Sequence, residues 1–150
     1  IIVEQVVTMG MYTELGWLRR ANAAHRSRVM EVLDRVGIAD LAKRQISELS
    51  GGQRRRVFVA RILVQAPELY LLDEPFAGVD AASERVIRGV LHELRDQGAT
   101  IVIVHHDLST VAELCDHVTI LNREIIATGP TSEAFTRENI TKAFGLGLLE

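Results

Sequence analysis

An apolar run that ends in two adjacent carboxylates offers the clearest chemistry in this 150-residue sequence. Residues 69–72 are followed directly by Asp73 and Glu74, and then by Pro75. If the run is a buried strand, it delivers Asp73 to the edge of a sheet, where a carboxylate helps to hold Mg²⁺ through part of the ion's water shell. Glu74 is turned the other way and can take a proton from an attacking water. The alternative is an ordinary strand end followed by an acidic turn.

A second candidate site is the run formed by Ser50, Gly51, Gly52 and Gln53. Serine is a favoured helix N-cap residue, so the sequence predicts a helix that begins here and runs toward Gln65. The two glycines leave backbone N–H groups uncovered at the positive end of the helix dipole, an arrangement that suits phosphate. Ser-Gly-Gly also makes a good flexible turn, and this alternative stays open on the motif alone.

His105, His106 and Asp107 follow another apolar run, residues 101–104. If both runs are parallel strands, the histidines lie at the same sheet edge as the two carboxylates, where one of them can contact a terminal phosphate. Adjacent residues of a strand point to opposite sides, so the pair is a poor joint ligand for one metal ion. The alternative is that each histidine is only a polar strand end.

These candidate residues need an α/β framework to position them. Up to residue 65 the sequence is typical of helices, with apolar residues at helical spacing in 29–36 and a stop at Gly37. Short apolar runs and helical patterns alternate afterwards. The expected strands are 69–72, 100–104, 118–121 and 125–127, with a turn at 122–123, and the expected helices are 82–97 and 111–115. Uniformly apolar strands separated by helices predict a parallel sheet covered on both faces.

Charge is unevenly distributed along the chain. Residues 1–65 carry 11 Lys/Arg against 6 Asp/Glu, and residues 66–150 carry 6 against 14. A basic first half suits nucleic acid or anionic lipid, but a solvated helical face with phosphate chemistry is the simpler interpretation. Cys115 is the only cysteine, which excludes an internal disulfide. No apolar run approaches the ~18 residues of a membrane span.

The ordered motifs resemble the nucleotide-binding domain of ABC transporters. The motifs are, in order, residues 49–53, 70–75, 77–80 and 106–107, and the likeness extends over essentially the whole chain. The resemblance implies part of a P-loop NTPase (RecA-like) core with parallel strands covered by helices, plus an α-helical subdomain that carries the signature motif. We assign residues 1–65 to that subdomain and residues 66–150 to the C-terminal part of the core.

The resemblance implies an ATP-hydrolysing enzyme with ATP and Mg²⁺ at its site. In the family the counterpart of Asp73 helps to coordinate Mg²⁺ and that of Glu74 is the catalytic base. His106 matches the switch histidine that contacts the γ-phosphate, and Asp80 matches the aspartate of the loop that links the two active sites of a dimer. The signature motif clamps ATP held by the opposite subunit, and its counterparts here are Ser50, Gly51, Gly52 and Gln53.

Departures from the family pattern limit what this chain can do alone. It contains no Gly-Lys-Ser/Thr, so the loop that cradles the β- and γ-phosphates is missing. Gln5 is not the family's permease-sensing glutamine, which belongs further upstream. His105 stands where the family often has Thr or Ser, and we choose His106 as the switch because it directly precedes Asp107. The chain also begins in mid-pattern without Met, so we expect a fragment that is inactive by itself.

A finer resemblance to importers of manganese, zinc and iron lies in residues 3–10, 12–20 and 129–144, and residues 121–123 and 135–139 lean toward manganese or iron. It implies a peripheral protein at the cytoplasmic face of the membrane, paired head to tail with a second ATP-binding subunit. Permease subunits, and indirectly an extracytoplasmic metal-binding protein, are the other expected partners, and nucleic acid is not. Trp17 either faces the permease's cytoplasmic helix or packs within the helical subdomain.

Other members of the family remain as alternatives. They are the ATP-binding subunit of another importer, such as an iron-siderophore importer, and ABC ATPases of DNA repair, chromosome structure or translation. The sequence has no heptads sustained over several turns, which disfavours a coiled-coil arm. A non-catalytic regulatory fragment is a further alternative, but the intact Asp73, Glu74 and His106 favour an active parent protein.

Overall fold

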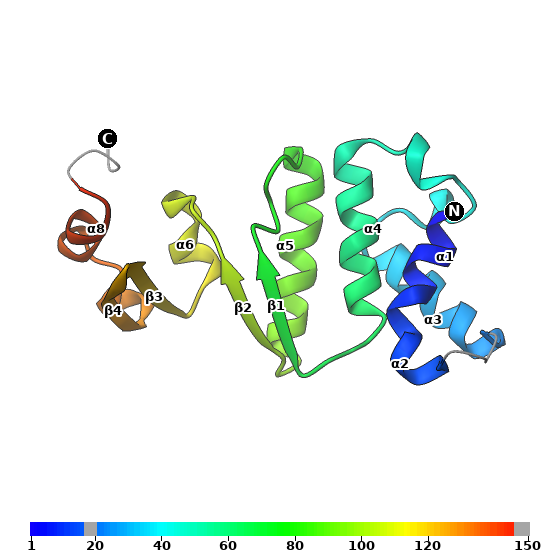
Figure 1. Cartoon of the computed structure of the whole chain (residues 1–150), viewed down its shortest axis with the longest axis horizontal. Helices are drawn as coiled ribbons and strands as arrows, with labels where there is room; N and C mark the ends of the chain where they lie inside the picture. Colours follow the sequence, from blue (N-terminus) through cyan, green and yellow to red (C-terminus); the bar gives the residue numbers. More distant parts are fainter. Residues whose placement is uncertain (17–20, 146–150) are drawn as a thin grey trace. The chain divides into compact units, whose positions relative to one another are not determined.

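The computed structural model describes residues 1–16 and 21–145. The chain divides into two compact units, Ile1–Val104 and His105–Glu150. Figure 1 colours both units along the sequence, from blue at the N-terminus to red at the C-terminus.

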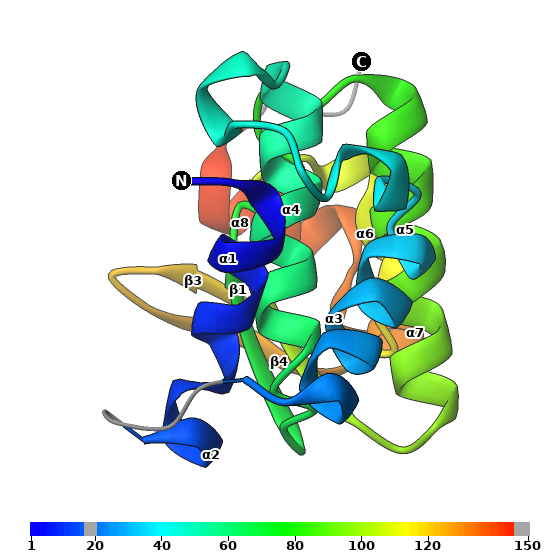
Figure 2. The same cartoon turned by 90° about the vertical axis from the view of Figure 1, so that its right-hand side faces the viewer.

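Helices form the first part of the first unit. They are α1 (Val3–Thr8), α2 (Tyr12–Leu15), α3 (Ala23–Arg35) and α4 (Gly51–Leu63), with short 3-10 helices at Met9–Met11, Ala39–Leu41 and Ile46–Glu48. Helix α1 packs against both α3 and α4, and Figure 2 shows the three side by side. The core between them is apolar and fully buried, and includes Val3, Val7, Val29, Leu33 and Val57. The helical prediction for this stretch is confirmed for the described residues.

Local signals explain where α3 begins and ends. Asn22 is its N-cap, because the Asn22 side chain accepts a hydrogen bond from the backbone N–H of His25 at 3.0 Å, while His25 Nδ1 accepts one from Asn22 N at 3.1 Å. Gly37, with a φ of 66°, takes the left-handed conformation that follows the last turn. The predicted stop at Gly37 is therefore confirmed.

A βαβ unit completes the first unit of the chain. Strand β1 (Leu69–Asp73) pairs in parallel with β2 (Thr100–Val104), and helix α5 (Ala81–Asp96) connects them. Helix α5 packs against β2 and α4, and it buries Ile87, Val90 and Leu91 on its apolar side. The sequence located these elements to within one residue at each end.

Within the described residues, only one of the two faces of this parallel sheet is covered. Tyr70 is buried, but on the other face Leu71 is 71% exposed, and Val102 and Val104 are 48% and 60% exposed. Since Leu71 lies opposite Val102 in the pairing register, these side chains form one apolar face. The physical reason is that a single βαβ connection places its helix on one side of the two strands only.

Between residues 105 and 145, the second unit contains a β-hairpin and three helices. Its elements are α6 (Leu108–Leu114), β3 (His117–Asn122), β4 (Glu124–Pro130), α7 (Thr131–Ala134) and α8 (Arg137–Phe144). Strands β3 and β4 pair antiparallel, and Arg123 turns the chain with a φ of 61°. The predicted turn at 122–123 is confirmed, whereas membership of these strands in the parallel sheet is wrong. A one-residue connection allows only an antiparallel hairpin, because a parallel pair needs a long crossover.

The hairpin has a small core of its own. Ile120 from β3 and Ile140 and Ala143 from α8 are buried together. Asn122 Nδ2 donates a hydrogen bond to the carbonyl of Ala143 at 2.7 Å and so fixes α8 to the end of β3. Within residues 1–16 and 21–145, no helix is long and apolar enough to cross a bilayer.

Candidate functional site

The first turn of α4 has the geometry of an anion-binding helix end. Ser50 Oγ accepts a hydrogen bond from the backbone N–H of Gln53 at 3.2 Å, and Gln53 Oε1 accepts one from the N–H of Ser50 at 2.9 Å. This reciprocal capping box confirms the predicted N-cap. The amides of Gly51 and Gly52 lie in the first turn, where the helix offers them no carbonyl, at the positive end of its dipole. This end of α4 fits a phosphate group.

Gly52 also allows two helix N-termini to come together. A Cβ added at Gly52 would lie 2.1 Å from Asp80 Oδ2 and 2.7 Å from Ser83 Oγ, closer than real Cβ atoms approach other atoms. The structure thus brings two of the predicted site elements, the signature run and Asp80, into contact within one chain. This packing role of Gly52 was not predicted.

Asp80 is the N-cap of α5, which sequence reasoning missed. Its Oδ1 accepts a hydrogen bond from the N–H of Ser83 at 2.9 Å, and its Oδ2 accepts one from the Ser83 hydroxyl at 2.8 Å. The bond from the Ser83 backbone, followed by that from its side chain, lowers the pKa of Asp80 below its ordinary value. The sequence signal for this cap was available, because Asp80 stands just before a strongly amphipathic helical pattern.

The two carboxylates lie where the sequence placed them, at the carboxyl end of β1. Asp73 is the last residue of the strand and is exposed, and Glu74 is half-buried. The N–H of Glu74 donates to the carbonyl of Val104 at 3.0 Å, which extends the ladder by one residue. Glu74 has a φ of 46°, in the left-handed region that L-residues avoid. The change of backbone conformation after Asp73 sets the direction of the Glu74 side chain.

Arg55, on α4, is a site residue that the sequence analysis did not single out. Its Nε donates to the carbonyl of Pro75 at 3.0 Å, and its Nη2 donates to the carbonyl of Asp73 at 3.4 Å and to that of Glu74. In the sequence Arg55 is one of three successive arginines in the basic first half, and nothing there distinguishes it from its neighbours.

The loop from Glu74 to Asp80 is further held by its own backbone and by one aromatic ring. The N–H of Ala77 donates to the carbonyl of Glu74 at 3.2 Å. Phe76 is buried, and the Arg88 guanidinium lies over its ring at 5.6 Å from the centroid. Arg88 itself forms an ion pair with Glu84 one turn earlier on α5, at 2.9 Å. The loop is therefore anchored to α5 as well as to α4.

The histidines belong to the second unit. His105 Nε2 lies 3.0 Å from Thr110 Oγ1, and the His105 and His106 ring centroids are 5.8 Å apart. Asp107 is the N-cap of α6 and accepts hydrogen bonds from the N–H and the hydroxyl of Ser109, at 3.0 and 2.6 Å. The capping role of Asp107 was not predicted, and the switch role of His106 stays a prediction.

The residues present fit Mg²⁺ bound together with a nucleotide. Over residues 1–16 and 21–145 there is no group of three or more His, Cys, Asp or Glu side chains suited to a metal ion. Mg²⁺ usually binds proteins through one or two carboxylates and takes its other ligands from water and phosphate. The exposed Asp73 carboxylate can provide such a ligand, and the amides at the start of α4 can receive a phosphate.

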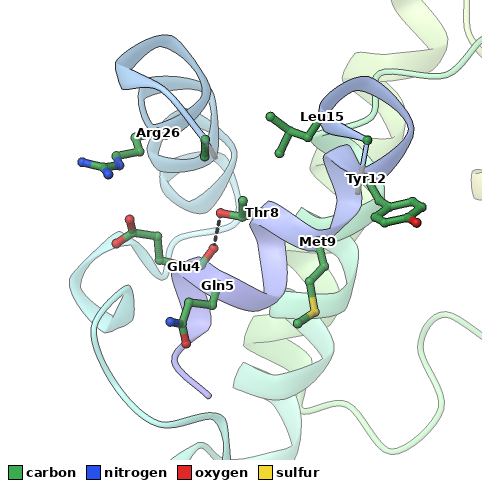
Figure 3. Close-up of a pocket in the computed structure, with 9 residues that line it drawn as sticks. Glu4, Gln5, Thr8, Met9, Tyr12, Leu15 and Arg26 are labelled. Carbon is green, nitrogen blue, oxygen red and sulfur yellow. Dashed lines mark hydrogen bonds between the residues drawn. The ribbon is translucent and has the colours of Figure 1, made fainter. Parts of the chain in front are cut away.

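A pocket of about 330 Å³ lies elsewhere in the first unit, beside α1 and α2. Figure 3 shows residues of α1 and α2 on one side of it and Arg26 of α3 on another. Met9 and Tyr12 are 50% and 59% exposed at its rim. It is lined by Glu4, Gln5, Thr8, Met9, Tyr12, Leu15, Gly16, Ala21 and Arg26. Trp17, for which the sequence left open a contact with a permease helix or packing within the helical subdomain, lies outside the described residues.

Comparison with known sequences identifies relatives over almost the whole chain. The chain is 48% identical over 144 residues to the manganese transport system ATP-binding protein MntB of Halalkalibacterium halodurans. The aligned region covers 96% of this chain and 58% of that relative. It is 50% identical over 143 residues to the zinc transport system ATP-binding protein TroB of Treponema pallidum, covering 95% of this chain and 54% of the relative. The chain thus spans little more than half the length of these relatives.

Solved structures and a family model agree with these relatives. A metal-chelate type ABC transporter in an inward-facing conformation has a TM-score of 0.90 at 30% identity, covering 97% of this chain and 59% of that one. The structure of an ATP-binding cassette of an ABC transporter in its ADP conformation has a TM-score of 0.75 at 26% identity. The match covers 95% of this chain and 59% of that one. The predicted α/β fold of a P-loop NTPase core is thereby confirmed. The model of the ABC transporter family matches residues 3–77, which is half of the chain. The chain therefore belongs to the ABC transporter family.

Proposed function

We propose that this chain is part of the ATP-hydrolysing subunit of an ABC importer of divalent metal ions. The observation that carries the proposal is the identity of 48–50%, over about 95% of the chain, to ATP-binding proteins named for manganese and zinc transport. The positions of the carboxylates at the end of β1 and of the capped glycines at the start of α4 support it. The active protein is a longer subunit that contains this chain.

In the proposed mechanism the protein acts mainly by positioning and electrostatics, as in other phosphoryl transfers. Glu74 takes a proton from the attacking water. Asp73 would help to hold Mg²⁺ through the ion's water shell, and the ion would supply neutralisation of the phosphate charge. His106 contacts the γ-phosphate. The amides of Gly51 and Gly52, aligned by the capping box of Ser50 and Gln53, stabilise the negative charge of a phosphate.

Two subunits pair head to tail in this proposal, so that each signature run completes the site of its partner. The contact between Gly52 and Asp80 supports a coupled arrangement, because both residues lie at the start of helices in one chain and both face a dimer interface in the family resemblance. A shift of either helix N-terminus would then change the geometry of both ATP sites of the dimer. The subunit works at the cytoplasmic face of the membrane with permease subunits and, through them, with a metal-binding protein.

The exposed apolar face of β1 and β2 is also accounted for by a longer subunit. Parallel strands are normally buried on both faces, and Leu71 and Val104 are well over half exposed here. We assign residues 66–150 to an ATPase core whose remaining part, with the phosphate-binding loop, covers this face. Residues 1–65 then form the helical subdomain that carries the signature.

The pocket beside α1 and α2 is the proposed contact for the permease. Its rim presents the exposed side chains of Met9 and Tyr12, and its lining includes the charged Glu4 and Arg26. Such a mixture suits the end of a short helix with one apolar and one polar side.

The choice among metals rests on small differences. Relatives named for manganese and for zinc are about equally similar to this chain, at 48% and 50% identity. We propose manganese or iron as the transported metal, because residues 121–123 and 135–139 resemble the importers of these two metals. Zinc is the alternative. No residue of this chain contacts the transported ion in this proposal, because the ion passes through the permease.

Calorimetry and a hydrolysis assay test the proposed ATPase. We expect the complete subunit to hydrolyse ATP and to lose that activity when EDTA removes Mg²⁺. We expect no binding of MgATP to the isolated 150-residue chain, which lacks the phosphate-binding loop. Micromolar binding by the isolated chain would show that the loop is less essential, and a complete subunit that fails to hydrolyse ATP would contradict the proposal.

A further inference from the structure

Arg55 joins the signature helix to the backbone that carries the two carboxylates. The three hydrogen bonds that it donates all go to backbone carbonyls, those of Asp73, Glu74 and Pro75. The guanidinium is a rigid, planar fork, so it can bind successive carbonyls at once in a way that a flexible ammonium group cannot. The Arg55 side chain is half-buried, which strengthens these bonds relative to exposed ones.

The bonds bracket a residue whose backbone is strained. Glu74 has a φ of 46°, a left-handed backbone conformation that is strained for a non-glycine residue. Such a conformation persists only where the surroundings hold it. On the strand side, the N–H of Glu74 is bound to the carbonyl of Val104 at 3.0 Å. On the side of α4, Arg55 holds the carbonyls before, at and after Glu74.

Arg55 also connects this loop to the phosphate-binding end of its own helix. It lies within the first two turns of α4, whose N-terminus is fixed by the capping box of Ser50 and Gln53. Helix α4 is continuous from Gly51 to Leu63, so a displacement of its first turn moves Arg55 with it. A change at the signature run can therefore reach the backbone of Glu74 through one side chain.

We propose that Arg55 is a positioning residue for Glu74, one that holds the Glu74 backbone in the conformation required for proton abstraction and transmits to it the state of the signature helix. This inference rests on the proposed ATPase function. It assigns Arg55 no contact with ATP, so the substitution acts on the chemical step rather than on nucleotide affinity.

Steady-state hydrolysis by the complete subunit with Arg55→Gln tests the proposal. We expect kcat to fall about 10- to 100-fold, because a small misplacement of a catalytic group has effects of this size. The KM for ATP should stay within about twofold, since no binding group is removed. The matched control is Arg61→Gln, an exposed arginine on the same helix, which should leave kcat unchanged.

The decisive measurement is the double-mutant cycle with Glu74→Gln. If Arg55 acts through Glu74, adding Arg55→Gln to Glu74→Gln produces no further loss of the residual rate. Independent, multiplying losses would overturn the proposal, as would a wild-type kcat in Arg55→Gln. An inactive wild-type subunit would instead refute the ATPase function itself, so the two failures are distinguishable.

A second variant keeps the test valid if Arg55→Gln does not fold. Arg55→Lys keeps the charge and the aliphatic stem but replaces the fork by a single ammonium group. We expect its kcat to lie between those of the wild type and Arg55→Gln, again with an unchanged KM. Wild-type kcat in Arg55→Lys would show that positive charge alone suffices, and would overturn the role of the fork.

Discussion

Glu74→Gln in the complete subunit lowers ATP turnover by about 10²–10⁴-fold, the usual contribution of a general base. Glutamine preserves the size of the side chain but cannot accept the proton of the attacking water. The backbone that positions residue 74 is held by the carbonyl of Val104 and by Arg55, and neither contact involves the Glu74 side chain. Because glutamine keeps the size of the side chain and these backbone contacts, we expect the loss to lie mainly in the chemical step. Single-turnover hydrolysis separates the chemical step from nucleotide binding.

ATP-dependent pairing of two subunits should survive in Glu74→Gln, because the substitution leaves the signature run intact. Size-exclusion chromatography with and without MgATP measures this directly. The matched control is Glu68→Gln, an exposed glutamate just before the start of β1, which should hydrolyse ATP at the wild-type rate. Near-normal hydrolysis by Glu74→Gln would remove this residue from the role of base.

Gly52→Ala is the second large effect, and it acts through packing. The new Cβ would meet Asp80 Oδ2 at 2.1 Å, and that carboxylate cannot turn away without losing its two hydrogen bonds to Ser83. Overpacking of this kind costs about 1–3 kcal/mol. The better helix propensity of alanine offsets at most about 1 kcal/mol. We expect a lower free energy of unfolding in urea and an ATP turnover that is lower by about 10- to 100-fold, because the two helix N-termini separate.

Two comparisons isolate the cause of the Gly52→Ala effect. Gly89 lies on the exposed side of α5, where an added Cβ meets nothing within 4 Å, so Gly89→Ala should leave stability equal or slightly higher. In an Asp80→Ala background the clash with the carboxylate is gone, and the stability penalty of Gly52→Ala should shrink. An equal penalty in both backgrounds would show that contact with Asp80 is not its source.

Local sequence signals were sufficient for most elements of the fold and for part of the site. Gly37 ends a helix and Ser50 begins one because capping depends on a few adjacent residues. The second strand was predicted with its observed bounds, Thr100–Val104, because a short run of β-branched residues has few other conformations available. The placement of Asp73 and Glu74 at a strand end could be read from the short, continuous apolar run of residues 69–72 that precedes them.

Features that depend on contacts between distant residues could not be predicted in this way. Arg55 reaches carbonyls 18 to 20 residues further along the chain, and no periodic pattern encodes such a bond. The approach of Gly52 to Asp80 depends on how α4 and α5 pack. The turn at 122–123 was predicted, but the uniformly apolar strand pattern did not reveal that β3 and β4 pair antiparallel in a separate sheet.

Metal accumulation in cells that carry the complete transporter tests the central claim most directly. Manganese, iron and zinc are measured in cells with the wild-type subunit and with Glu74→Gln, at matched protein levels. The proposed function predicts a selective loss of manganese or iron uptake in the mutant. Unchanged uptake of all three metals, with the mutant protein present and its ATP hydrolysis lost, would contradict the assignment to a metal importer.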